Sequence, residues 1–295
     1  MIEIDATLVR QLIRTQFPQW AALPVAPVEN GGWDNRSFRL GNSMSVRLPS
    51  ASRYVAQVEK EHRWLPQLRP RLPLPIPLPL GLGVPGSGYP WPWSIYSWLD
   101  GKPAHATRIL DLNLFAVDLA RFLVALRGID ASNGPVAGTH NLHRGGSLTV
   151  YDTETRQSIG ALADLIDVAA VTEVWDVALT TSWHVRPVWI HGDVAETNLL
   201  VTAGRLSAVI DFGSAGIGDP SCDLAIAWTF LDSSSREQFR SAIGLDPATW
   251  RRARGWAIWK ALITLAQLRD TDPNQARRAL QVIRSVLDDH KRRAP

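Results

Sequence analysis

Several features that would place a chain outside the cell or in a membrane are missing from this sequence. It has a single cysteine, Cys222, so no disulfide can form within the chain, and we interpret this residue as a small buried side chain rather than a nucleophile. No run of 18 apolar residues free of charge or proline occurs, so no membrane-spanning helix is expected. The first residues lack a basic segment followed by an apolar run, so no signal peptide is predicted and a cytoplasmic location is expected.

An excess of charge of one sign is also lacking. The 31 basic and 28 acidic residues leave a net charge of +3, and no run of Lys and Arg typical of nucleic-acid binding occurs. We interpret the cluster of Arg251, Arg252 and Arg254 as a solvated helix face. Neither nucleic acid nor a membrane is expected as a partner, and the sequence leaves open whether the chain is a monomer or a homodimer. The hydrophobic fraction of 45% supports a full core over 295 residues.

The most informative part of the chain is residues 189–223. It contains two short apolar segments, 198–201 and 206–210, separated by a turn that contains glycine, a pattern that predicts a β-hairpin. Polar residues stand beside both segments, in the orders H-x-D-x-x-x-x-N and D-F-G: His191, Asp193, Asn198 and Asp211.

This pattern is typical of phosphoryl transfer, which needs a carboxylate near the attacking hydroxyl and oxygen ligands for Mg²⁺ on a rigid scaffold. Asp193 is the predicted base, and Asn198 and Asp211 are the predicted Mg²⁺ ligands, because both side chains supply hard oxygen atoms. His191 is predicted to hold the loop rather than to act as the base. The alternative, that Asp193 and Asp211 only end strands and cap turns, is disfavoured by the presence of both motifs in order.

This stretch resembles the aminoglycoside phosphotransferase family, a small-molecule branch of the protein-kinase-like fold. Gly192 stands where protein kinases usually have Arg, and the sequence G-D-P-S-C-D-L-A after D-F-G leaves no room for an activation loop before Asp223. The resemblance implies an α+β, two-lobed fold. Residues 1–100 would form a small N-lobe of antiparallel sheet with one αC-like helix. Residues 101–295 would form a larger, mostly helical C-lobe with the catalytic loop, the metal site and the substrate-binding helices.

The resemblance also assigns residues to the nucleotide. Gly31 and Gly32 would cover the phosphates, although alone they equally suggest a plain hairpin turn. Arg47 stands on a predicted strand where protein kinases have Lys, and macrolide phosphotransferases, which are similar, also carry an R-x-P element there. Arg47 would therefore hold the α- and β-phosphates. Glu61, on a helix predicted over 53–68, would pair with Arg47, and Glu59 is its competitor.

The hinge between the lobes is predicted at residues 97–101, where Ser97 and Leu99 would bind the nucleotide base through their backbone. Backbone recognition does not distinguish ATP from GTP. The proline-rich segment after residue 69 is predicted to be extended and to lie at a sheet edge. Apolar periodicity predicts further helices over 5–17, 110–127, 153–182, 224–231, 234–243, 247–268 and 273–291.

Two groups of polar residues leave alternatives open. His143 and Arg144, before Gly145 and Gly146, suggest an anion site, and a plain loop is the preferred interpretation. A set of carboxylates on the predicted helical segment 153–182 would suit a cationic substrate, and solvated helix charges explain them equally well: Asp164, Asp167, Glu173 and Asp176.

We therefore predict a Mg²⁺-dependent enzyme that moves the γ-phosphate of ATP or GTP to a hydroxyl of a small molecule, an aminoglycoside-type antibiotic or a related compound. The alternatives are a kinase of a macrolide or another apolar antibiotic or metabolite, and a catalytically silent nucleotide-binding homologue. Ala294 and Pro295 end the sequence, in place of the acidic end that many aminoglycoside kinases use for substrate. The presence of the complete set of Asp193, Asn198 and Asp211 in this chain disfavours a silent protein.

Overall fold

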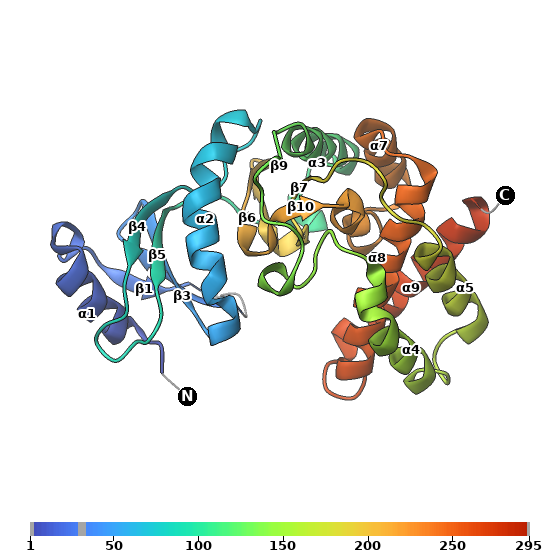
Figure 1. Ribbon diagram of the computed structural model, residues 1–295, viewed down its shortest axis with the longest axis horizontal. Coiled ribbons are helices and arrows are strands. Elements are labelled where there is room, and N and C mark those ends of the chain that lie inside the picture. Colours follow the sequence, from blue (N-terminus) through green and yellow to red (C-terminus); the bar gives the residue numbers. More distant parts are fainter. Residues whose placement is uncertain (1–2, 29–33, 294–295) are drawn as a thin grey trace.

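The computed structural model describes residues 3–28 and 34–293 of the chain. Gly31 and Gly32 lie outside the described residues. A sheet with one long helix on either side forms one end of the molecule, and a group of packed helices forms the other (Figure 1). None of the described helices is long and apolar enough to cross a membrane. The proposed boundary at residues 100 and 101 falls in the connection between these two parts, and it stays a prediction.

The N-terminal sheet is antiparallel, with the strand order β1-β2-β3-β5-β4. Helix α1 (Ala6–Gln16) packs on one face through Val9, Leu12 and Ile13, and the carboxylate of Asp5 caps it by accepting from the N–H of Leu8 at 2.8 Å. The proline-rich segment leads into β4 at the sheet edge, as predicted. The strands are β1 (Val25–Pro27), β2 (Asn35–Leu40), β3 (Met44–Pro49), β4 (Pro79–Gly83) and β5 (Trp93–Ser97).

The alternation of side chains along β3 gives Arg47 its direction. Val46 and Leu48 are fully buried in the core that α1 covers, so Arg47 between them points to the other face of the sheet. Helix α2 (Val55–Leu68) lies on that face and presents the buried Glu61. The sheet and α2 therefore hold Arg47 between them.

The C-terminal part contains two small sheets, which carry the loops of the motif, and a set of helices. Strands β6 (Lys102–Pro103), β8 (Leu199–Thr202) and β9 (Arg205–Val209) form one sheet, and β7 (Val188–Ile190) pairs with β10 (Gly216–Gly218). The predicted hairpin is thus β8–β9. The helices are α3 (Leu112–Arg127), α4 (Asp152–Ala161), α5 (Val168–Leu179), α6 (Ile226–Thr229), α7 (Ser233–Ile243), α8 (Pro247–Leu268) and α9 (Pro273–Arg293).

Two helix predictions were wrong in detail. The single helix expected over 153–182 is two helices, α4 and α5, because the fully buried Leu162 ends the first and the Asp167 carboxylate caps the second by accepting from the N–H of Ala170 at 3.0 Å. Of the helix expected over 224–231, only α6 is α-helical, and the residues just before it end a 3₁₀ segment, Pro220–Ala225.

The expectation that Arg251, Arg252 and Arg254 form a solvated helix face was also wrong. Arg252 and Arg254 are 5% and 4% exposed, because other elements cover α8 on several sides. Arg252 pairs with Asp219 at 2.6 Å, and Arg254 pairs with Asp289 at 2.8 Å. These guanidinium groups therefore belong to the interior of the molecule, where each is compensated by a carboxylate.

Candidate active site

A glycine brings the two motifs into contact. Gly192, in H-G-D, has φ +83°, and a Cβ at this position would lie 2.3 Å from the carbonyl oxygen of Ser214, in the turn that follows D-F-G. No side chain fits there, so the loop after β7 can pack directly on the segment after β9. Asp211 itself adopts the left-handed conformation, φ +66° and ψ +71°, which is uncommon outside glycine and concentrates at functional sites.

A buried carboxylate holds the backbone of the H-G-D loop in place. Asp223 accepts hydrogen bonds from the backbone N–H groups of His191 at 2.8 Å and Gly192 at 2.7 Å. Burial raises the pKa of Asp223, and these two donors oppose that rise. Asp223 thus holds the backbone of this loop.

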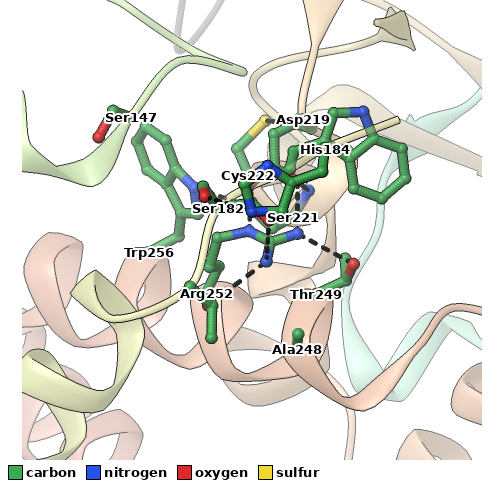
Figure 2. A network of polar contacts seen from close by, with 12 residues as sticks. Ser147, Ser182, His184, Asp219, Ser221, Cys222, Ala248, Thr249, Arg252 and Trp256 are labelled. Carbon is green, nitrogen blue, oxygen red and sulfur yellow. Dashed lines mark hydrogen bonds and ion pairs between the residues drawn. The ribbon is translucent and has the colours of Figure 1, made fainter. Parts of the chain in front are cut away.

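Asp219 belongs to a separate buried network. Its carboxylate pairs with Arg252 and accepts from the N–H of Ser221 at 3.0 Å, while Arg252 also donates to Thr249 at 3.0 Å. Figure 2 shows this network beside Cys222 and Trp256. Burial raises the pKa of the Cys222 thiol well above its ordinary value, which agrees with the interpretation of this residue as a buried side chain and not a nucleophile.

His191 is fully buried, and both of its ring nitrogens are occupied. Nδ1 accepts from the N–H of Asp193 at 3.2 Å, so Nε2 carries the proton and donates to the carbonyl of Ile210 at 3.0 Å. The ring also packs edge-on against Phe212 of D-F-G, with centroids 4.7 Å apart. These contacts tie the loop of Asp193 to the end of β9, which is the holding function expected of His191.

Asp193 is oriented by its neighbours and still reachable. Asn198 Nδ2 donates to the Asp193 carbonyl at 3.0 Å and to its Oδ2 at 3.1 Å, and Lys260 Nζ lies 3.2 Å from Oδ1. The side chain of Asp193 remains 36% exposed, so an acceptor hydroxyl can approach it. Burial acts to raise the pKa of Asp193, but the surrounding positive charges, that of Lys260 foremost, together with the hydrogen bond from Lys260 outweigh burial, and the pKa is lowered from its ordinary value.

Arg47 lies between two carboxylates from different parts of the fold. Its Nη2 bonds Asp211 Oδ1 at 2.8 Å, and its Nη1 lies 3.6 Å from Glu61 Oε1. The hydroxyl of Tyr96 donates to the other oxygen of Glu61. Glu61 is buried, whereas Glu59 is exposed on the far side of α2. The structure thus places Glu61, and not Glu59, beside Arg47.

The donor atoms around Asn198 and Asp211 fit a magnesium ion. The amide nitrogen of Asn198 is engaged by Asp193, which leaves its carbonyl oxygen as the free ligand, and Asp211 contributes a carboxylate. Two hard oxygens suit Mg²⁺, which usually takes few protein ligands and completes its shell with phosphate and water. Among the described residues no cluster of three or more His, Cys, Asp and Glu could hold a metal ion alone, in agreement with that mode of binding.

Three charged residues near these loops were not found from the sequence. Asp34 has its pKa raised by burial and further by Asp211 and Asp193. Lys60 donates to the carbonyl of Gly213 at 2.6 Å, and burial lowers the pKa of Lys60 to about 8. Lys260 projects from α8, far along the chain. None of the three belongs to a local motif, so only their position in space indicates a role.

The two predicted hinge residues differ in what they offer a nucleotide. The N–H of Ser97 donates to the carbonyl of Leu78 at 2.9 Å, and its hydroxyl accepts from the N–H of Leu78 at 3.0 Å. The backbone of Leu99 makes no hydrogen bond to another described residue. Of the two, Leu99 therefore keeps its backbone N–H and carbonyl free for a base.

Known proteins match both the sequence and the fold. Residues 25–256 match the family model described as the phosphotransferase enzyme family. A 65-residue segment is 46% identical to an aminoglycoside 3'-phosphotransferase of Escherichia coli, and it covers 21% of this chain and 24% of that protein. The chain therefore spans about a quarter of the length of this curated relative.

Among solved structures, the GDP complex of wild-type aminoglycoside 2'-phosphotransferase-IIIa has a TM-score of 0.71 at 18% identity, and the match covers 97% of this chain and 100% of that one. A macrolide 2'-phosphotransferase from Brachybacterium faecium has a TM-score of 0.60 at 20% identity, covering 95% and 97%. These likenesses confirm the fold predicted from the motifs, with a small antiparallel sheet and one αC-like helix followed by a mostly helical region.

Proposed function

This chain belongs to the phosphotransferase enzyme family, and on that premise we propose that it moves the γ-phosphate of a nucleoside triphosphate to a hydroxyl of a small molecule. One observation carries the proposal: the H-G-D and D-F-G loops are in direct contact, with Arg47 bonded to Asp211 across from Asp193 and Asn198. A carboxylate base, two oxygen ligands and a phosphate-binding cation are thereby gathered in one place, which is what phosphoryl transfer requires.

The nucleotide side of the site is assigned to four residues. Arg47, oriented by Glu61, would grip the α- and β-phosphates through its two-pronged guanidinium. Leu99 would bind the base through its free backbone groups, with Ser97 fixing the strand that leads to it. The GDP in the related 2'-phosphotransferase supports a nucleotide at this position. Backbone recognition suits either ATP or GTP.

Asn198 and Asp211 would hold Mg²⁺, which, when bound, offsets the charge of the phosphates. The orientation of Asn198 serves this role, since its amide nitrogen is turned to Asp193 and its oxygen is left free. Asp211 forms an ion pair with Arg47 at 2.8 Å in this structure.

Asp193 would act on the acceptor. Its carboxylate accepts the proton of the acceptor hydroxyl while the hydroxyl oxygen bonds to the γ-phosphorus, and the bond from that phosphorus to the bridging oxygen of the diphosphate breaks. The products are a phosphate ester and a nucleoside diphosphate. The lowered pKa keeps Asp193 ionised at neutral pH, and a positioned base of this kind contributes roughly 10²–10⁴-fold to rate.

The names of the relatives supply two classes of acceptor, aminoglycosides and macrolides. The aminoglycoside-type acceptor is supported by these relatives. The surface carboxylates considered as a wall for a cationic substrate do not add to that support, because each is engaged within this chain. Three of them pair with basic side chains and the fourth caps α5: Asp164 with Arg269, Glu173 with His290, Asp176 with Arg156, and Asp167.

A screen for release of nucleoside diphosphate tests the proposal, with Mg-ATP and Mg-GTP against aminoglycosides, macrolides and hydroxylated metabolites. Turnover that disappears in Asp193→Asn while nucleotide still binds would support the assigned base, and retained turnover would remove Asp193 from that role. Asp211→Ala should lose the Mg²⁺-dependent part of nucleotide binding, and unchanged affinity with Mg²⁺ would contradict the ligand assignment. Nucleotide binding without transfer to any alcohol would favour a silent homologue.

A further inference from the structure

Two cations beside Asp193 have no part in the proposed transfer. The first is Lys260 on α8, whose Nζ lies 3.2 Å from Asp193 Oδ1 and whose side chain is 45% exposed. This lysine comes from the helical part of the molecule, whereas Arg47 comes from the sheet and pairs with Asp211. The carboxylate oxygen of Asp193 that faces α8 therefore lies beside a positive charge.

The second cation is Arg144, in the loop before α4. Its guanidinium lies over the rings of Trp256 and Trp259, with its central carbon 5.2 and 4.7 Å from the ring centroids. Trp256 precedes Lys260 by one helical turn, so the two share a face of α8 and Arg144 lies along the face from which Lys260 projects. Arg144 and Lys260 thus form one cationic pair, which we call the α8 cation pair.

The position of Arg144 is fixed by its surroundings. Its N–H bonds the carbonyl of Asn141 at 3.1 Å, its own carbonyl accepts from Asn141 Nδ2 at 3.0 Å, and the next residue, Gly145, accepts from the N–H of Asp219 at 2.8 Å. The two indoles beneath the guanidinium are only 2% and 5% exposed and do not move freely. The side chain is therefore pre-organised.

No carboxylate within the described part of the chain compensates Arg144. Its guanidinium makes no hydrogen bond or ion pair to a described residue, and its Nε is buried without a partner. The nearby carboxylates are engaged elsewhere: Asp219 with Arg252, Asp223 with backbone N–H groups, and Glu154 with the indole N–H of Trp259 at 2.9 Å. A partly buried guanidinium left unpaired is costly, and an anionic ligand would satisfy it.

We infer that the acceptor of this enzyme carries an anionic group, a carboxylate or a phosphate ester, near the hydroxyl that receives the phosphoryl group, and that Arg144 and Lys260 bind this group. The inference rests on the proposed function. A guanidinium matches two oxygens of such a group at once, and an adjacent ammonium adds a second charge-assisted contact. A polycation such as an aminoglycoside would instead meet two positive charges beside Asp193. The charge of Arg144 also acts on Asp193: together with the charge of Lys260 it lowers the pKa of Asp193 against the effect of burial.

The α8 cation pair could instead bind the γ-phosphoryl group of the nucleotide. The direct experiment first fills the γ-phosphoryl position with the complex of Mg²⁺ and a non-hydrolysable ATP analogue. Inorganic phosphate is then titrated while the intrinsic tryptophan fluorescence of the protein, to which Trp256 and Trp259 contribute, is followed. We expect phosphate to bind to the loaded protein and to bind at least tenfold more weakly to Arg144→Gln and Lys260→Gln, since each loses a charged hydrogen bond. Lys291→Gln, which removes the same charge from the exposed surface of α9, is the matched control.

The turnover experiment compares acceptors that differ only in charge: hydroxylated carboxylic acids, their neutral methyl esters, and the corresponding amines, together with aminoglycosides. We expect turnover of the acids, with the KM of the acid raised at least tenfold in both variants and the KM of the nucleotide unchanged. Arg144→Lys, which keeps the charge, should fall between wild type and Arg144→Gln. If Arg144→Gln fails to fold, the exposed Lys260→Gln still gives the answer.

Three results would overturn the inference: phosphate that no longer binds once the analogue occupies the site, turnover of the amines or esters equal to that of the acids, or no turnover of any acid. A loss of kcat that is equal for every acceptor would assign the α8 cation pair to the phosphoryl group instead. Failure of the Mg²⁺ analogue complex to bind at all would contradict the proposed function itself, and this inference with it.

Discussion

Arg47 donates a hydrogen bond to Asp211 at 2.8 Å, although 164 residues separate them in the chain. One stands on the central strand of the N-terminal sheet, and the other follows the β8–β9 hairpin of the C-terminal part. The cation assigned to the phosphates and the carboxylate assigned to Mg²⁺ therefore neutralise each other in this structure. A bound Mg-nucleotide has to exchange this pair for two others, Arg47 with phosphate and Asp211 with the metal, while Glu61 stays as the second partner of Arg47.

The first prediction separates Glu61 from its neighbour Glu59. Glu61→Gln should raise the KM for Mg-nucleotide about tenfold, because the amide keeps the shape of the side chain but no longer holds Arg47 by charge once Asp211 has turned to the metal. Glu59→Gln removes the same charge from the exposed side of the same helix and should leave KM unchanged. Steady-state kinetics with varied nucleotide measures both. Equal effects of the two substitutions would show that the pairing of Glu61 with Arg47 has no role in binding.

The second prediction concerns the pH dependence of the base. Lys260 makes the largest contribution among the groups that together outweigh burial and keep the pKa of Asp193 below its ordinary value. Lys260→Met removes that charge, so burial should raise the pKa of Asp193 and shift the acidic limb of kcat/KM to higher pH. Activity at low pH should therefore fall more than activity near neutral pH. Rates measured between about pH 4 and 8, with Lys291→Met as the control, test this, and an unshifted acidic limb would remove Lys260 from the environment of the base.

The sequence revealed those residues of the site that belong to one short motif, and it did not reveal those that come from distant parts of the chain. Asp193 and Asn198 lie five residues apart on one loop, so both were found from one short motif, and the structure joins them by hydrogen bonds. Glu61 was assigned from the family resemblance, with Glu59 as its competitor, and the structure places Glu61 beside Arg47. Lys260 and Arg144 meet Asp193 from a distant helix and a distant loop, and no pattern in the chain joins the three residues.

The buried arginines of α8 show the opposite case, a local signal that misled. Three arginines within four positions are typical of a solvated helix face, and the sequence contains no sign that α4, α5 and α9 pack around this helix. The compensating carboxylates, Asp219 and Asp289, stand 33 and 35 residues away from Arg252 and Arg254. Burial of a charge is a property of the assembled fold, so it could not be read from its neighbours in sequence.

The third prediction tests the glycine between the two motifs. Gly192→Ala places a Cβ at φ +83° and 2.3 Å from the carbonyl oxygen of Ser214, so we expect the free energy of unfolding to fall by at least about 2 kcal/mol and turnover to be lost. Gly160→Ala is the matched control, because a Cβ at that exposed helical position meets nothing within 4 Å and should stabilise by up to about 1 kcal/mol. Urea unfolding compares them. Equal stability of the two variants would show that the loops do not need this close approach.

The last prediction concerns the buried pair of Arg252 and Asp219 in Figure 2. Arg252→Met leaves the Asp219 carboxylate buried with only the backbone and hydroxyl of Ser221 as partners, which should cost about 3–5 kcal/mol of unfolding free energy. Arg251→Met, at the adjacent and partly exposed position, should change the unfolding free energy by less than about 1 kcal/mol.

A second substitution tests whether the loss of unfolding free energy comes from the buried, unpaired charge of Asp219. In the background of Arg252→Met, Asp219→Asn removes the charge and should recover part of the loss, since a neutral amide is cheaper to bury than a carboxylate. The N–H of Asp219 bonds Gly145, next to Arg144, so the same single variant should also loosen the α8 cation pair and weaken phosphate binding to the nucleotide-loaded protein. Urea unfolding and the phosphate titration read the two effects separately. Full stability of Arg252→Met would mean that water or a rearranged side chain satisfies Asp219, and that this network does not position the loop of Arg144.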